Sequence, residues 1–355
     1  MAGDSDQIIA EAAARIFADL ADPQTINHAA NGAWKAPLWR ALAEAGLPLA
    51  WVPEELGGSG AGLSAGFAIL GVAGRFALAV PFAETLAAGW LLARAGLAAP
   101  ATPMSLAPVR PRDRLTIDRD GKLSGRAVGV PFARDTQHIA VLADGGPQLI
   151  VALAATENCR LGEAHNLAGD AADVVTFERV KPVRSAPAPD GFDRTALLLV
   201  GATIRSVETA GALEAILSLA AGYANERVAF ERRIGKFQAV QQNLARLAGE
   251  VAAALAVAGS AADTIARAET FDEAVLLEAA SAKIRTGEAA TEGAAIAHQV
   301  FGAIGFTKEH ILHRFTLRML AWRDDFGNES HWAVELGHRI AQRGADEFWP
   351  LVASR

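Results

Sequence analysis

The feature that most constrains the fold is a change of sequence pattern in the middle of the chain. Before residue 100, apolar side chains recur at helical spacing, as in Ile9, Ala13 and Ile16. Residues 101–190 instead contain short runs rich in β-branched residues, and Asp144-Gly-Gly-Pro between two of these runs predicts a hairpin turn. After about residue 193 the helical spacing returns. The order helical, β, helical predicts several packed units in a chain of 355 residues.

These patterns give a fold class that is mostly α with a small middle β domain. We expect an N-terminal helical domain over residues 1–100, a middle β domain over 101–190 and a C-terminal helical domain over 191–355. The short strands of the middle region predict a small β-barrel or sandwich. Four long helices in the last region, including 274–300 and 330–344, predict an antiparallel four-helix bundle.

Composition excludes several classes of function. The net charge of -7 argues against nucleic acid as the main partner. Because Cys159 is the one cysteine, the chain forms no internal disulfide and no thiolate metal site, so we expect no metal and a cytoplasmic location. The N-terminus carries acids where a signal peptide needs cations, and we found no apolar run long enough to predict a membrane span.

The run from Tyr223 to Gln238 is the first candidate binding segment. Tyr223, Arg227 and Phe230 are four and three residues apart, which predicts that they share one helix face. The fixed charge and forked donors of Arg227 suit a phosphate. The alternative is a solvated arginine paired with Glu231, which is the more common situation for a single arginine.

The run His298-Gln-Val-Phe-Gly-Ala-Ile-Gly-Phe306 is the second candidate segment. Gly302 and Gly305 follow a helical pattern, and their backbone amides could approach a phosphate closely. The alternative is an ordinary helix end followed by a loop. Neither segment is specific when taken alone.

Together the motifs resemble the acyl-CoA dehydrogenase family. The runs Tyr-x-x-x-Arg-x-x-Phe, Ile-Gly-x-Phe-Gln and Gln-x-x-Gly-x-x-Gly-Phe resemble its C-terminal domain, and Val52-Pro-Glu-Glu-Leu-Gly-Gly58 resembles a loop of its N-terminal domain. The resemblance spans nearly the whole chain. It implies a helical domain, a β-barrel and a four-helix bundle, an FAD cofactor bound across a subunit interface, an acyl-CoA substrate, and an electron-transferring flavoprotein as electron acceptor.

The resemblance also assigns expected roles to five residues. Arg227 matches the arginine that contacts the FAD pyrophosphate, and Gln238 matches the glutamine that follows it. Gln299 and Gly302 match the motif that holds the ADP part of a neighbouring subunit's flavin. Phe230 matches an aromatic residue that packs against the cofactor.

The flavin-ring part of the family pattern is missing. Phe230-Glu231 stands where the family has Phe-Gly, and the middle domain is short. The family's Thr-Glu-Pro-x-x-Gly-Ser-Asp loop, which holds the flavin ring and the substrate, has no match between residues 101 and 190. The nearest segment, Gly129-Val-Pro-Phe-Ala-Arg134, lacks those donors.

The catalytic base is also missing from its usual places. The reaction removes a proton α to a thioester while hydride leaves the β carbon, which requires a carboxylate in a dry pocket. One family position reads Phe326, before Gly327, and the alternative position aligns near Gly201. Asp325 is the nearest candidate base, with Glu329 second.

Two of the carboxylates around Gly327 also have ordinary structural interpretations. Asp324, next to Asp325, is expected to pair with Arg323, and Glu329 suits a helix N-terminus.

The departures lead to three hypotheses. In the first, the chain resembles the short subunits of α2β2 heteromeric dehydrogenases of bacterial steroid degradation, and it supplies the ADP-binding half of the FAD site. In the second, it is a self-sufficient homo-oligomer that uses Asp325 or Glu329 as base. In the third, it is a flavin- or acyl-CoA-binding scaffold without turnover. We prefer the first, with a wide acyl group as substrate.

Overall fold

The computed structural model describes residues 4–29 and 32–353. The N-terminal part is helical, and its apolar helix faces pack together around the buried ring of Phe17. Its elements are α1 (Asp4–Leu20), α2 (Pro23–Asn27), α3 (Lys35–Glu44), the 3-10 turns η1 (Leu47–Leu49) and η2 (Glu54–Leu56), α4 (Leu63–Arg75) and α5 (Phe82–Arg94). Pro81 separates the last two of these helices and immediately precedes the first residue of α5.

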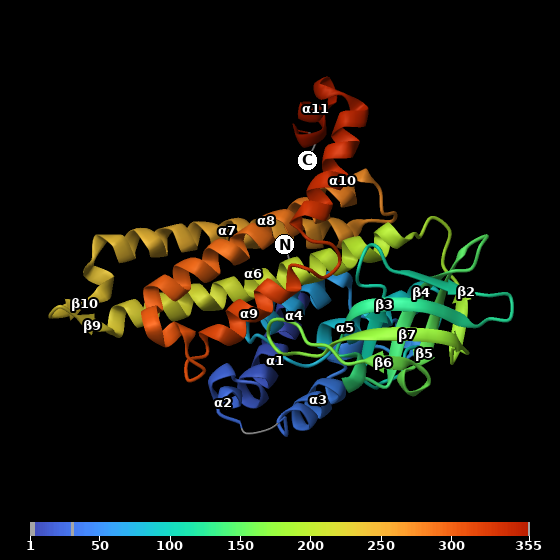
Figure 1. Ribbon diagram of the computed structural model, residues 1–355, viewed down its shortest axis with the longest axis horizontal. Helices are drawn as coiled ribbons and strands as arrows, with labels where there is room; N and C mark the ends of the chain where they lie inside the picture. The colour runs from blue at the N-terminus through green and yellow to red at the C-terminus, as the bar shows by residue number, and fades with distance from the viewer. Residues whose placement is uncertain (1–3, 30–31, 354–355) are drawn as a thin grey trace.

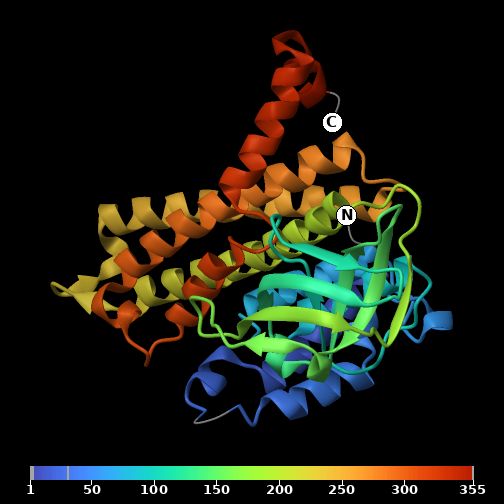
Figure 2. The same cartoon turned by 45° about the vertical axis from the view of Figure 1, so that its right-hand side comes forward.

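The middle part is an eight-stranded sheet that curls around its own apolar core (Figure 2). Its strands are β1 (Met104–Ala107), β2 (Arg114–Ile117), β3 (Leu123–Pro131), β4 (His138–Asp144), β5 (Leu149–Ala155), β6 (Arg160–Gly162), β7 (Ala172–Val180) and β8 (Arg184–Pro187). They are ordered β6-β7-β3-β2-β4-β5-β8, with β1 pairing with β4. β4 and β5 form the expected hairpin, which Gly145 closes by donating to the Gln148 carbonyl at 3.0 Å.

The last part is built on three long helices that run alongside one another (Figure 1). Its elements are α6 (Arg194–Glu226), the short strands β9 (Val228–Ala229) and β10 (Arg232–Arg233), η5 (Ile234–Lys236), α7 (Gln238–Arg267), α8 (Glu273–Phe301), η6 (Gly302–Phe306), α9 (Leu312–Trp322), α10 (Glu329–Arg343), η7 (Ala345–Glu347) and α11 (Phe348–Ala353). The sequence analysis missed α9, which packs on α6 and α8 as the fourth helix of this group.

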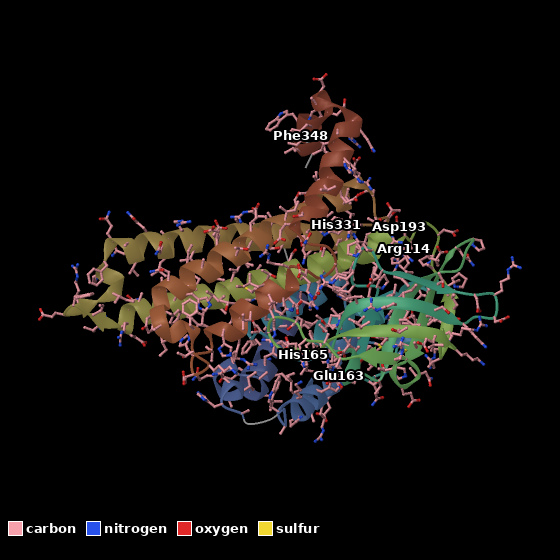
Figure 3. The ribbon with its side chains drawn as sticks, viewed as in Figure 1. Arg114, Glu163, His165, Asp193, His331 and Phe348 are labelled. Carbon is pink, nitrogen blue, oxygen red and sulfur yellow. The ribbon has the colours of Figure 1, made fainter. Side chains whose placement is uncertain are left out.

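The helix expected over 330–344 forms as α10, but it does not run along the bundle. Its buried Trp332 anchors the first turn, whereas residues 341–350 are exposed. Figure 1 shows α10 and α11 standing away from the body, and Figure 3 places Phe348 near the end of this arm. Helix α10 therefore contributes to the core mainly through Trp332 in its first turn.

Among the described residues, two helices are long and apolar enough to cross a membrane when judged by length and composition alone. The expectation that the chain contains no apolar run of this length was therefore wrong. The two helices are α6 and α7, whose most apolar 18-residue stretches are 89% and 28% buried inside the fold. The central helix of a folded core passes the same test, so α6 needs no membrane to explain its composition.

Candidate cofactor and reaction site

The Arg227 segment lies at one end of the bundle, and there the sequence prediction was wrong in one respect. Helix α6 ends at Glu226, and Arg227 already has extended backbone angles of φ -66° and ψ 123°. Phe230 therefore does not share a helix face with Tyr223 and Arg227. It lies instead in the turn between β9 and β10, where its side chain is 88% exposed.

The chain leaves the helix there because it must reverse direction to begin α7. Ile234 donates from its backbone to the Arg227 carbonyl at 2.8 Å, which closes the reversal. Gly235 passes so close to α6 that a Cβ there would lie 2.9 Å from the Ala224 carbonyl oxygen. The glycine of the Ile-Gly-x-Phe-Gln motif is thus a packing requirement at the helix end.

The turn itself has an unfavourable backbone. Phe230 and Glu231 have φ values of +53° and +63°, which is the left-handed region that glycine normally occupies. The Arg232 guanidinium lies 4.1 Å above the Phe237 ring and covers part of it. Figure 1 shows this hairpin protruding from the end of the bundle. Its Phe230, Arg232 and Arg233 are exposed.

The Gln299 segment reaches the same end of the bundle. Helix α8 ends at Phe301, and its ring lies 4.6 Å from the Tyr223 ring of α6. Gly302 follows with φ +63°, and a Cβ there would meet nothing within 4 Å. The structure thus joins the two predicted segments through the Tyr223–Phe301 contact.

A cavity of about 570 Å³ opens beside the second segment. It lies between α8 and α9 and is closed by η6 at one end. Gln299 and Gly302 are both among its lining residues, which also include His298, Phe306 and Thr316. An amide side chain, an open glycine and aromatic rings therefore border one space, with Arg227 and Gln238 exposed on the hairpin and helix start nearby.

The two positions expected to carry a base are in contact with each other. A Cβ built on Gly201 would lie 2.2 Å from Cδ1 of the Phe326 ring, so the ring fills the space over the glycine. The Phe326 backbone is held by a donation to the Val109 carbonyl at 3.0 Å, and its own carbonyl accepts from Trp332 Nε1 at 3.0 Å. The ring is therefore firmly placed and is almost fully buried.

A buried ion cluster lies close to these two residues. Arg205 donates to Glu84 at 2.5 Å, to Glu208 at 2.7 Å and to Asp325 at 3.1 Å. Its guanidinium also lies 5.8 Å from the Trp322 ring centre. The four charged side chains line a cleft of about 360 Å³ between the middle sheet, α5, α6 and the end of α9.

Burial shifts the protonation of this cluster. Desolvation raises the pKa of Glu84, and it raises the pKa of Glu208 to about 7 against the attraction of Arg205. Desolvation also lowers the pKa of the nearby Lys283 to about 7, although its ammonium donates to the Trp322 carbonyl at 2.6 Å. The cleft thus combines a buried charge cluster with apolar walls that include Leu78, Val80 and Trp322.

Each candidate base has an ion-pair partner. Asp325 accepts from Arg205 Nε, and its side chain is only 13% exposed. Glu329 accepts from Arg323 Nε at 2.5 Å, and its carboxylate lies over Gly287, where a Cβ would be 1.9 Å from Oε1. Both carboxylates are therefore engaged within the fold, whereas a general base needs to reach the substrate proton.

The sequence analysis did not find Glu84, Arg205 or Glu208. The signal that could have found them is a charged residue inside an otherwise apolar helical stretch, which is rarely buried unless paired. Their pairing could not be read from spacing, because Arg205 and Glu84 are 121 positions apart.

The FAD expected from the resemblance fits one end of this site and not the other. At the bundle end, the exposed Arg227, the open backbone at Gly302 and the cavity beside Gln299 suit an adenine nucleotide. At the other end, the charged side chains that line the cleft are paired with one another, and the neighbouring Phe326 ring covers Gly201, so neither family position offers a carboxylate. Within residues 4–29 and 32–353, no group of three or more His, Cys, Asp or Glu is arranged for a metal.

Comparison with known proteins identifies the class. Residues 3–99 match the family model for the N-terminal domain of acyl-CoA dehydrogenases, and residues 192–328 match the model for their C-terminal domain. The chain therefore belongs to the acyl-CoA dehydrogenase family, whose members are FAD-dependent oxidoreductases that act on CH–CH bonds.

Individual relatives agree with this assignment. The chain is 28% identical over 346 residues to acyl-CoA dehydrogenase IpdE2 of Mycobacterium tuberculosis, an alignment that covers 97% of each protein. A chain in the ChsE4-ChsE5 complex from Mycobacterium tuberculosis has a TM-score of 0.85 at 23% identity, with 97% of this chain and 99% of that chain covered. A chain of a Tcur3481-Tcur3483 steroid ACAD variant has a TM-score of 0.83 at 26% identity, with 96% and 98% covered.

Proposed function

We propose that this chain is one subunit of a heteromeric acyl-CoA dehydrogenase and supplies the ADP-binding half of a shared FAD site. The observation that carries the proposal is the contact between Gly201 and Phe326. It places no carboxylate at either family position and fills the space between them. When bound, FAD accepts the hydride that leaves the β carbon of the acyl group. The ring contacts and the base then come from a partner chain of the same family.

The residues that match the family's ADP-binding motifs support the proposal that two chains share the FAD site. Arg227, Gln238, Gln299 and Gly302 are exposed at one end of the bundle, where a second chain can bring its flavin to them. The Tyr223–Phe301 contact holds the two segments together. One structurally similar chain comes from the ChsE4-ChsE5 complex and another from the Tcur3481-Tcur3483 steroid ACAD variant, which is consistent with a partner chain.

The self-sufficient homo-oligomer is the second candidate, with Asp325 or Glu329 as base. Their pairing with Arg205 and Arg323 gives it less support, because each carboxylate would first have to leave its guanidinium. The substrate we propose is an acyl-CoA thioester with a wide acyl group, such as a steroid side chain. An electron-transferring flavoprotein is the electron acceptor that we propose.

Co-expression tests the proposal directly. The chain is purified alone and together with a family member from the same genome that retains the ring loop and the glutamate. Bound flavin is measured by its absorbance, and turnover is measured with an acyl-CoA and an artificial electron acceptor. We expect FAD and activity only in the pair. A yellow, active preparation of this chain alone would show that the proposal is wrong.

Variants within the pair separate the two candidate functions. Arg227→Ala should lower FAD occupancy, whereas Arg160→Ala, an exposed arginine on β6 paired with Glu178, should not. Asp325→Asn should leave turnover within a few fold of the unmodified pair if the base belongs to the partner. Complete loss of turnover with full FAD occupancy would support the self-sufficient enzyme.

A further inference from the structure

The arm formed by the end of α10, η7 and α11 exposes large apolar side chains at its tip. Phe348, Trp349 and Val352 are 45%, 71% and 41% exposed. Within the described residues, α11 packs mainly on η7 of the same arm, and Figures 1 and 2 show the arm standing away from the body. A helix of 6 residues is marginal by itself in water, so we expect this tip to pack against another surface.

A groove of about 360 Å³ lies on the body of the molecule between α4, α6 and α7. Its lining includes the apolar side chains of Phe67, Val72 and Leu255. Helices α4 and α6 cross closely beside it, because a Cβ on Gly211 would lie 2.1 Å from the Gly71 carbonyl oxygen. The two glycines keep side chains out of this crossing, so the groove stays open. Its volume is sufficient for one aromatic side chain.

The polar groups of the groove suit a tryptophan. Glu214 and Asp263 line it together with the apolar residues. A buried indole needs an acceptor for its N–H, and a carboxylate supplies one. Glu214 pairs with Arg75 at 3.6 Å and Asp263 pairs with Arg267 at 3.1 Å, so these four charges balance and do not favour a charged occupant.

The molecule exposes more surface than a compact monomer of its size. Its accessible surface is 15978 Å². A compact monomer of 37.0 kDa exposes about 13,600 Å². The excess of about 2,400 Å² is larger than the roughly 800 Å² that each partner buries in a standard protein–protein interface. The surplus is therefore sufficient for an interface that covers the arm and the groove.

We propose that two copies of this chain exchange arms, with Trp349 of each copy seated in the α4–α6–α7 groove of the other. Because the tip and the groove belong to the same chain, a two-fold axis lets each copy supply one arm and receive one. The exchange buries the tip and fills the groove in both copies. It joins identical chains, so it does not depend on the proposed function, in which the partner is a different chain.

Analytical ultracentrifugation of the purified full chain over a micromolar concentration series tests the proposal. We expect a monomer–dimer equilibrium, and a chain that ends at Gly344 should be monomeric over the same range. Trp349→Ser should raise the dimer Kd at least about tenfold, because a tryptophan at the centre of an interface carries much of its binding energy. Ile8→Ser, which removes a side chain of α1 that is 63% exposed, should match the unmodified chain.

Two glycines of α7 give a matched pair of variants for the groove. Gly259 lines the groove and Gly249 does not, and at either position a Cβ would meet nothing within 4 Å. Leucine is the better helix former, so both leucine variants should fold. Gly259→Leu should weaken the dimer as Trp349→Ser does, whereas Gly249→Leu should not. An equimolar mixture of Trp349→Ser and Gly259→Leu should recover part of the dimer, because the mixed pair retains one intact arm facing one intact groove.

Four results would each overturn the proposal. They are a monomeric unmodified chain, a dimer of equal strength in the chain that ends at Gly344, equal effects of the two glycine variants, and no recovery in the mixture. If removal of the arm weakens only the binding of a co-expressed partner chain, the arm docks on that chain and the proposal is wrong. Flavin content and turnover decide the proposed function separately, so either proposal can fail while the other stands.

Discussion

The Phe326 ring lies against Gly201 so closely that the glycine can carry no side chain. A Cβ at Gly201 would lie 2.2 Å from Cδ1 and 2.3 Å from Cγ of that ring. The two residues are 125 positions apart (326 − 201) and come from α6 and the loop after α9. They meet because two hydrogen bonds hold the Phe326 backbone in place: its N–H donates to the Val109 carbonyl, and its carbonyl accepts from Trp332 Nε1.

Gly201→Ala should destabilise the fold by about 1–3 kcal/mol, because the added methyl group overpacks a fixed ring. Chemical denaturation measures the change in the free energy of unfolding. In combination with Phe326→Leu, the alanine should cost much less than it does alone, and the double-mutant cycle should show coupling above about 0.5 kcal/mol. Additive effects would mean that the two side chains do not meet.

Arg205→Met should be far more damaging than the loss of a surface arginine. It leaves Glu84, Glu208 and Asp325 buried without their shared cation, which costs about 3–5 kcal/mol in comparable buried pairs. Arg246→Met is the matched control, because Arg246 pairs with Glu292 on the surface. The control should change stability by less than about 1 kcal/mol. Similar losses in both variants would contradict a buried cluster.

Lys283 should make stability rise with pH above neutrality. Its folded-state pKa is lowered to about 7 from 10.5, so between these values the unfolded chain binds a proton that the folded chain does not. The free energy of unfolding therefore increases from pH 7 toward pH 10, with a slope of up to about 1.4 kcal/mol per pH unit. Urea denaturation across this range measures it, and Lys283→Met should remove the slope.

Glu231→Gly should stabilise the hairpin by about 1 kcal/mol, because glycine adopts the φ of +63° without the penalty that a Cβ brings. Glu231→Ala keeps the Cβ and serves as the control. Hydrogen exchange at the backbone amide of Ile234, which donates to the Arg227 carbonyl at 2.8 Å, should slow in the glycine variant and not in the alanine variant. Equal protection in both would place the strain elsewhere.

The order of elements was predictable because periodicity and turn residues act locally. The helix over 274–300 and the Asp144 hairpin both follow from neighbours in the sequence. The end of α6 was not predictable, since no glycine or proline marks Arg227. What ends the helix is the return of the chain past Ala224 at Gly235, which is a tertiary contact.

The candidate site also contains some residues that the sequence could identify and others that it could not. Motif residues such as Gln299 and Gly302 could be picked out because their spacing is preserved within one segment. The Arg205 cluster joins α5, α6 and the loop after α9, so no window of sequence contains it. The sequence could show that positions 201 and 326 carry no carboxylate. It could not show that the Phe326 ring fills the space over Gly201, because that contact is tertiary.

The Gly201–Phe326 contact is an obstacle to a carboxylate at either of these two positions. A glutamate restored at position 201 would collide with the ring, and one restored at 326 would be buried over glycine as an unpaired charge. Either single step therefore lowers stability before it gives any activity. In the proposed heteromeric enzyme, natural selection would therefore preserve the partnership with the second chain more easily than it would place a base in this one.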